Sequence, residues 1–168
     1  MTATGTVTLA PLDDDLRPDV LAISVAPEQV RFGGVPAQSV PAADRDPARE
    51  SVVILRDGVP VGYFQLDTRS VPGAPAAADI LGLRALAIDR GAQGQGVGTA
   101  AMAALPAFVR PRFPGRRFVT LTVNTDNPAA IALYARAGFA DAGVGDYLGG
   151  RTGPQHVLLL DVAARDAP

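Results

Sequence analysis

The chain has no cysteine and no lysine, and its apolar runs are far too short to cross a membrane. Without cysteine there is no disulfide, no thiolate metal site and no cysteine nucleophile. All 15 basic residues are arginines, and the net charge of −2 argues against a nucleic-acid-binding surface. The amino terminus lacks a basic region followed by an apolar stretch. We therefore expect a cytoplasmic protein with no membrane partner, no nucleic-acid partner and no bound metal.

Composition favours one domain, residues 1–168. Apolar residues make up 48% of the chain, which is enough to form a hydrophobic core without disulfide cross-links. A chain of this length buries roughly 70% of its unfolded surface. Strands are expected at residues 6–10, 51–55, 59–67, 80–88, 117–123, 140–144 and 156–162, and helices at 13–25, 28–32, 97–109 and 128–137. This mixture predicts an α/β fold with helices on both faces of a mixed sheet.

Turn and breaker residues mark the boundaries between these elements. Arg56-Asp57-Gly58 is a hairpin signal. The stretch from Gly33 to Arg49 is rich in proline and alanine and is expected to be a loop, either irregular throughout or with a helical turn, and Ser70 to Ala78 is expected to be a mobile connection. Pro106 lacks the N–H that a helix interior requires, so it predicts a kink or an early end.

A glycine-rich turn, Gln93-Gly94-Gln95-Gly96-Val97-Gly98-Thr99, lies between a predicted strand and a predicted helix. Glycine lets backbone N–H groups approach an anion closely, and the first N–H groups of a helix have no internal partner. The turn therefore predicts a phosphate site. A P-loop is excluded, because it requires a lysine.

A dinucleotide fingerprint is a second interpretation of the same turn. Residues 96–101 match its glycine and alanine positions, and Asp126 follows after another strand. However, the segment from Ile88 to Gly96 is long for the tight turn that this fingerprint requires. The motif also lies past the middle of the chain, which leaves too few residues for a doubly wound domain.

A second motif lies about thirty residues further on, from Asn127 to Phe139. Asn127 is expected to cap a helix, Pro128 to begin it and Gly138 to end it. Together the two segments resemble the Gcn5-related N-acetyltransferase (GNAT) superfamily. Its cofactor motif, Gln/Arg-x-x-Gly-x-Gly/Ala, matches residues 93–98, and its downstream motif, Asn-x-x-Ala-x-x-Leu-Tyr-x-x-x-Gly-Phe, matches residues 127–139. Residues 27–32 and 60–64 resemble the bacterial branch that includes spermidine and diamine acetyltransferases.

The resemblance implies a sheet that splays between strands 4 and 5 to admit acetyl-CoA. It also implies where the cofactor is held: the turn binds the diphosphate, and the edge of the preceding strand pairs with the pantetheine arm. Asn127 is either a helix cap only or also a ligand of the cofactor. The cofactor-binding set is Leu86, Ala87, Ile88, Gln93, Gly94, Gln95, Gly96, Val97, Gly98, Thr99, Asn127 and Tyr134.

Tyr134 is the candidate catalytic residue. In the family this hydroxyl lies near the CoA sulfur and protonates the departing thiolate. Phenol has an ordinary pKa of about 10, so the proton is available at neutral pH. The alternative is that Tyr134 only packs against Ile131 and Ala130, one helical turn back.

The general base is not identified by the sequence. Family members place a glutamate at the position of Gly82 or at that of Thr122, and neither is a carboxylate here. The candidates are Asp67, Asp79, Asp146, His156 and a water relay through Thr122. For each aspartate a solvated loop position is the competing interpretation, and for His156 it is a structural role.

The acceptor of the acetyl group is also open. Four scattered aspartates would have to converge to bind a polyamine: Asp67, Asp79, Asp141 and Asp146. Arg84, placed by alternation on the face of Gly82, Leu86 and Ile88, is either a ligand for a carboxylate-bearing acceptor or a solvated edge residue. The leading function is N-acetylation of a small amine, with dimers frequent in the family. The alternatives are a catalytically weak CoA-binding protein and a dinucleotide-dependent oxidoreductase.

Overall fold

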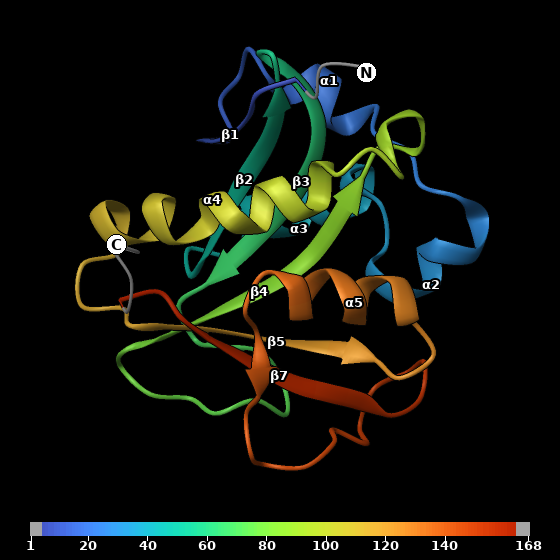
Figure 1. The fold of residues 1–168 in the computed structure, drawn as a ribbon. Coiled ribbons are helices and arrows are strands. Elements are labelled where there is room, and N and C mark those ends of the chain that lie inside the picture. The colour runs from blue at the N-terminus through green and yellow to red at the C-terminus, as the bar shows by residue number, and fades with distance from the viewer. Residues whose placement is uncertain (1–4, 164–168) are drawn as a thin grey trace.

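The computed structural model describes residues 5–163, in which a seven-stranded mixed sheet has the order β1-β2-β3-β4-β5-β7-β6 (Figure 1). The expected α/β fold is confirmed, while residues 1–4 and 164–168 of the predicted domain lie outside the described part. The strands are β1 (Val7–Pro11), β2 (Arg49–Arg56), β3 (Val59–Asp67), β4 (Ile80–Ile88), β5 (Phe118–Asn124), β6 (Ala140–Asp141) and β7 (Gln155–Asp161). The helices are α1 (Arg17–Leu21), η1 (Pro27–Gln29), α2 (Val30–Gly33), α3 (Pro36–Asp44), η2 (Arg90–Ala92), α4 (Val97–Arg112) and α5 (Pro128–Arg136).

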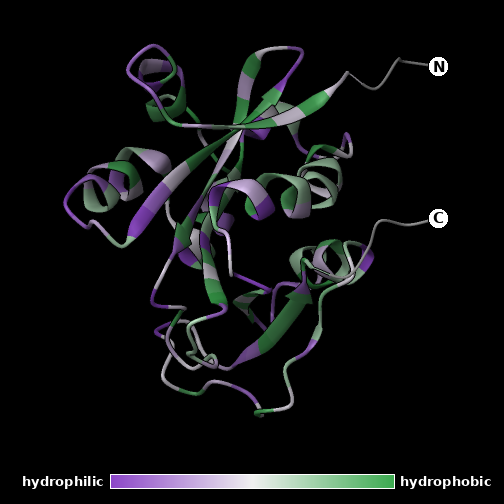
Figure 2. Ribbon diagram, turned by 90° about the vertical axis from the view of Figure 1, so that its left-hand side faces the viewer, coloured by the Kyte–Doolittle hydropathy of each residue, from purple (hydrophilic) through white to green (hydrophobic). Residues whose placement is uncertain are grey.

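Helices cover both faces of the sheet, as predicted. The larger core packs α4 and α5 against one face, where Met102 and Leu105 meet Phe64 and Leu121. The smaller core joins α1 and α3 to the other face around Tyr63. Figure 2 shows hydrophobic residues along the strands between these layers. Among residues 5–163, no helix combines the length and apolarity needed to cross a bilayer.

The sheet splays in its middle, as the resemblance implied. β4 and β5 form the parallel pair, but their ladder joins only residues 80–82 to residues 118–120. Beyond Gly82 the edge of β4 has no partner on β5. β7 lies antiparallel to β5 over its full length, so β5 stays flat against β7 while β4 follows β3. The two halves of the sheet therefore separate toward the carboxyl end of β4.

A bulge in β4 overturns the simple alternation expected for Arg84. Gln65 pairs with Arg84 and Tyr63 pairs with Ala87, so β4 has one extra residue opposite β3. Ala85 accommodates it with a φ of 59°, which is unusual for a residue other than glycine. Leu86 and Ile88 pack in the larger core, whereas Arg84 shares the face of Gln65 and Asp67. The expectation that Arg84 shares a face with Leu86 and Ile88 is wrong.

Several predictions near prolines are also wrong. The stretch from Gly33 to Arg49, predicted as a loop with at most a helical turn, contains the nine-residue α3, which begins with Pro36 at its first position and buries Val40 and Ala43. The helix predicted over residues 13–25 is the short α1. α4 does not end early at Pro106 but continues to Arg112, because its face with Met102, Leu105 and Val109 is buried against the sheet; a kink at Pro106 stays a prediction. Packing outweighs the missing hydrogen bond at Pro106.

Candidate functional site

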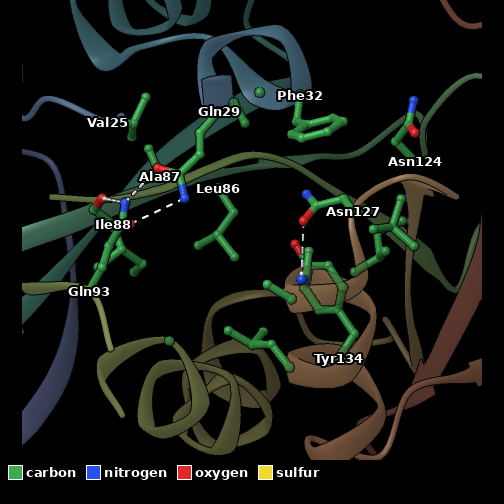
Figure 3. Close-up of a pocket in the computed structure, with 18 of the residues that line it drawn as sticks. Val25, Gln29, Phe32, Leu86, Ala87, Ile88, Gln93, Asn124, Asn127 and Tyr134 are labelled. Atoms are coloured by element: carbon green, nitrogen blue, oxygen red, sulfur yellow. Dashed lines mark hydrogen bonds between the residues drawn. The ribbon is translucent and has the colours of Figure 1, made fainter. Parts of the chain in front are cut away.

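A cavity of about 510 Å³ opens where β4 and β5 separate. It is bounded by β4 and β5, by the amino-terminal ends of α4 and α5, and by the η1–α2 segment. Figure 3 shows Gln29 and Phe32 on one side, Asn127 and Tyr134 on the other, and Leu86 between them. A cavity of this size is typical of a small-molecule site. Eleven of the twelve predicted cofactor-binding residues line it, all but Gln95: Leu86, Ala87, Ile88, Gln93, Gly94, Gly96, Val97, Gly98, Thr99, Asn127 and Tyr134.

The glycine-rich turn forms an open cradle at the start of α4. Gly94 and Gly96 have φ angles of 72° and 78°, in the left-handed region that favours glycine. A Cβ atom at either position would have no neighbour within 4 Å. Gly96 is the N-cap of α4, so the N–H groups of Val97 and Gly98 belong to the first turn and lack helical partners. This geometry suits an anion at the positive end of the helix.

The two glutamines of the turn hold it to the rest of the fold. The Gln93 side chain donates to the Ile88 carbonyl at 3.0 Å and exchanges hydrogen bonds with the Gln29 amide (Figure 3). Gln95 accepts from Arg56 and donates to the Gly91 carbonyl at 3.0 Å. Gln95 does not line the cavity, so its side chain stabilises the turn on the side away from the cavity.

The unpaired edge of β4 runs along the cavity. Leu86, Ala87 and Ile88 line it, and β5 offers them no ladder partner. An extended ligand with amide groups fits such an edge, because it can pair as an added half-strand. Together with the cradle, this edge suits coenzyme A, which carries a diphosphate and an amide-bearing arm.

α5 brings Asn127 and Tyr134 to the opposite wall. The Asn127 side chain accepts a hydrogen bond from the Ala130 N–H at 3.3 Å, so it caps α5, and it still lines the cavity. Tyr134 is 6% exposed and meets Phe139 edge to face at 5.4 Å. Within residues 5–163 its hydroxyl has no hydrogen-bond partner from the protein. Burial raises the pKa of Tyr134, which keeps the hydroxyl protonated.

The position of Gly82 has no room for a side chain. A Cβ atom there would lie 2.5 Å from the Ser70 carbonyl carbon and 2.8 Å from a Val71 methyl group. Ser70 has a φ of 75°, and its hydroxyl donates to the Pro75 carbonyl, so the chain after β3 folds directly over Gly82. The family's glutamate at this position is therefore excluded by packing as well as by sequence. Thr122, at the other glutamate position, lines the cavity.

The remaining candidate bases lie away from the cavity lining. For Asp67 the interpretation as a solvated loop residue is wrong. The residue is 1% exposed and paired with arginines. Burial alone would raise the pKa of Asp67, but hydrogen bonds and the charge of Arg69, with a bond from Arg49, lower it. His156 is held by Asp146, with 2.8 Å between Nδ1 and Oδ1. Among residues 5–163, no aspartate or glutamate lines the cavity.

Sequence reasoning missed several polar residues of the cavity. Asn124, at the end of β5, is buried and donates to the Thr152 carbonyl and hydroxyl at 2.8 and 2.9 Å. This ties the loop before β7 to the splayed edge and places Gln155 in the wall. The one available signal was a polar residue ending a buried strand. Gln29 reaches the cavity from η1, where its side chain bonds that of Gln93, and no local sequence signal indicates this contact.

Sequence comparison identifies the family to which this site belongs. The profile of the acetyltransferase (GNAT) family matches residues 17–139. The chain belongs to the GNAT acetyltransferase family. A protein of Bacillus subtilis (strain 168), the uncharacterized N-acetyltransferase YbbJ, is 34% identical over 131 residues, which cover 75% of this chain and 80% of YbbJ.

Two solved structures share the fold. AAC(6')-Ib in complex with ribostamycin and coenzyme A has a TM-score of 0.76 at 19% identity, covering 97% of this chain and 98% of its own. Spermidine N-acetyltransferase from Vibrio cholerae in complex with CoA and spermine has a TM-score of 0.69 at 14% identity, covering 94% and 96%. Family membership makes the chain a GNAT acetyltransferase, and the cosubstrate of this family is acetyl-CoA. Family membership decides against the dinucleotide-dependent oxidoreductase.

Proposed function

We propose that the chain transfers the acetyl group of acetyl-CoA to a primary amine of a small molecule, directly within a ternary complex. The observation that carries this proposal is the single cavity that brings together an anion cradle, an unpaired strand edge and a buried tyrosine hydroxyl. Ribostamycin and spermine, the ligands of the two similar structures, are both amines. A homodimer and a cytoplasmic location remain predictions.

Each predicted residue has a defined task in this reaction. Bound acetyl-CoA supplies the acetyl thioester. Backbone N–H groups from Gln93 to Thr99 hold the diphosphate, and Leu86 to Ile88 align the pantetheine amides. As the acceptor nitrogen bonds to the acetyl carbon and the carbon–sulfur bond breaks, the Tyr134 hydroxyl gives its proton to the sulfur. The nitrogen loses its proton to solvent, and Tyr134 then recovers one.

The cradle can be tested by adding a side chain to Gly96. In Gly96→Val, the β-branched residue must adopt a φ of 78°, and its side chain fills the space left for the diphosphate. We expect the Kd for CoA, measured by calorimetry, to rise at least about tenfold. Gly115→Val is the matched control, because Gly115 has a φ of 86° and open space but lies outside the cavity lining. Equal CoA affinity in the two variants would contradict the assignment.

The expected pH dependence rests on the cavity wall, which has no carboxylate from residues 5–163. The acceptor must lose its proton to solvent, so kcat/KM is expected to rise about tenfold per pH unit up to the pKa of the acceptor amine. The raised pKa of Tyr134 keeps the general acid protonated over this range, so activity does not fall on the alkaline side. Profiles for two acceptors of different pKa should be displaced by that difference. A shared plateau beginning near pH 7 would instead reveal a base on the enzyme.

The second candidate is a CoA-binding protein with weak catalysis, which the missing carboxylate favours. Turnover measured with a thiol reagent, across amino acids, polyamines, aminoglycosides and peptide amino termini, separates the two. The enzyme should release CoA with at least one amine above the rate of hydrolysis. Tight CoA binding with no release across the panel would favour the second candidate.

A further inference from the structure

The charge of the cavity wall is of one sign. Arg84 and Arg136 are the charged side chains that line it, and no carboxylate from residues 5–163 does. Arg136 is exposed in the last turn of α5, beside the region assigned to the cofactor. Arg84 comes from β4, just before the bulge at Ala85 and two residues before Leu86, where the assigned pantetheine edge begins. Arg84 therefore lies at the acceptor end of the cavity.

Arg84 is held in place from behind by buried Asp67. Its Nη1 lies 3.5 Å from Asp67 Oδ2, and the Arg84 side chain is 33% exposed while that of Asp67 is 2% exposed. Arg49 and Arg69 bond the same carboxylate more closely, at 3.3 and 3.1 Å, and both also pair with Asp46. Arg84 is therefore partly exposed but also has an ionic partner, which a purely solvated edge residue would lack. Its position is fixed by a shared, buried partner.

The cluster carries an excess positive charge, and Arg84 is the member that faces the cavity. Three guanidinium groups share two carboxylates, and Arg84 has the longest contact with them. Burial and the charge of Arg49 lower the pKa of Arg84. A further anion beside Arg84 would therefore stabilise its charged form. A guanidinium has five N–H donors. Within residues 5–163, no buried side-chain nitrogen lacks a hydrogen-bond partner, so the unpaired donors of Arg84 are open to solvent.

We propose that Arg84 selects the acceptor, and that the acceptor is a small amine bearing a carboxylate, as an amino acid does. The proposal rests on the proposed acetyl transfer and names the substrate class of that same site. An arginine fork binds a carboxylate through two parallel hydrogen bonds. The same charge repels polycations, and no carboxylate on the wall compensates for them. Polyamines and aminoglycosides, the ligand classes of the similar structures, are therefore poor acceptors for this chain.

The test compares free amino acids with their amides. CoA release is measured with leucine, phenylalanine, aspartate and glutamate, with the four corresponding C-terminal amides, and with spermidine and kanamycin. The α-amine of an amino acid amide is less basic than that of the free acid. At neutral pH a larger fraction of it is unprotonated, so without any recognition of the carboxylate the amide would react faster. We expect the best free acid to exceed its amide by at least about tenfold in kcat/KM, and to exceed both polycations.

Variants connect this preference to the arginine. In Arg84→Gln, Asp67 keeps Arg49 and Arg69, so the fold should persist. We expect kcat/KM for the free acid to fall about 10- to 100-fold, mainly through KM, and the ratio of acid to amide to approach one. Arg84→Lys keeps the positive charge but not the forked guanidinium, so its kcat/KM for the free acid should fall less than that of Arg84→Gln. Arg45→Gln, at an exposed residue outside the cavity lining, should change neither value.

The failures of the two proposals can be distinguished. Preference for spermidine, kanamycin or the amides, or an acid-to-amide ratio that Arg84→Gln leaves unchanged, would overturn the role of Arg84 while leaving acetyl transfer intact. An equal loss for all acceptors together with a lower Tm would show that Arg84 only supports Asp67, and would also overturn it. Absence of CoA release with every amine would overturn the proposed function itself, and this inference with it.

Discussion

Replacing Tyr134 with phenylalanine is expected to lower kcat by about 10²–10⁴-fold while leaving acetyl-CoA affinity nearly unchanged. The hydroxyl has no hydrogen-bond partner from residues 5–163, so its removal leaves no polar group of the fold unsatisfied. The ring keeps its edge-to-face contact with Phe139. The loss should therefore appear in the chemical step, where the departing sulfur needs a proton. Single-turnover kinetics with saturating acetyl-CoA measure this step.

Tyr147→Phe is the matched control for this prediction. Tyr147 packs on Gly73, outside the cavity lining, so the same deletion there should leave kcat unchanged. Both variants should melt near the temperature of the unchanged chain. If Tyr134→Phe retained full turnover with acetyl-CoA bound, the general-acid role would be wrong. Tyr134 would then be a packing residue of α5.

Replacing Asp67 with alanine is expected to destabilise the fold by about 3 kcal/mol, a fall in Tm of about 6–12 °C. The variant leaves Arg49, Arg69 and Arg84 close together without the carboxylate that they share. The estimate is at the lower end for a broken buried pair because the arginines are partly exposed. Thermal denaturation at neutral pH measures the loss. Asp14→Ala, at a fully exposed carboxylate, should change Tm by less than about 2 °C.

The loss of stability in Asp67→Ala should depend on pH. The folded pKa of Asp67 is lowered, so its contribution to stability is fully present above the ordinary carboxyl pKa of about 3.9. It is lost as the pH falls through the lower folded pKa. The difference in Tm between Asp67→Ala and the unchanged chain should therefore be constant from pH 7 to about pH 5 and shrink below about pH 4. A difference that grew on acidification would show that Asp67 is not held ionised.

Local signals accounted for the elements nearest the cofactor. Asn127, Pro128 and Gly138 specify the ends of α5 within one short segment, and the structure places α5 at Pro128–Arg136. The hairpin around Arg56-Asp57-Gly58 is likewise encoded locally, and β2 and β3 flank it as predicted. The open cradle at the start of α4, the proposed diphosphate site, was predictable because glycines occupy the positions of positive φ at residues 94 and 96.

Non-local packing decided what the sequence could not show. Asp67 looked like a solvated residue at a strand end, since nothing local indicated that arginines from β2 and β4 would enclose it. The bulge at Ala85 places Leu86 and Ile88 on the opposite face of the sheet from Arg84, and no glycine at the bulge signals this change. The closure over Gly82 depends on the path of Ser70 and Val71 above it. These features lie on the side where we propose that the acceptor binds, which is why the donor was easier to predict than the acceptor.

The central claim is that the cavity between β4 and β5 binds acetyl-CoA and lets an amine take the acetyl group directly. Acetyl-CoA with an isotopically labelled acetyl group, incubated with the protein and the amine panel, tests it by mass spectrometry of both small molecules and protein. The account predicts a labelled N-acetyl product equal in amount to the CoA released, with no label on the protein. A labelled acetyl-protein, or bound acetyl-CoA that yields no N-acetyl product from any amine, would contradict it.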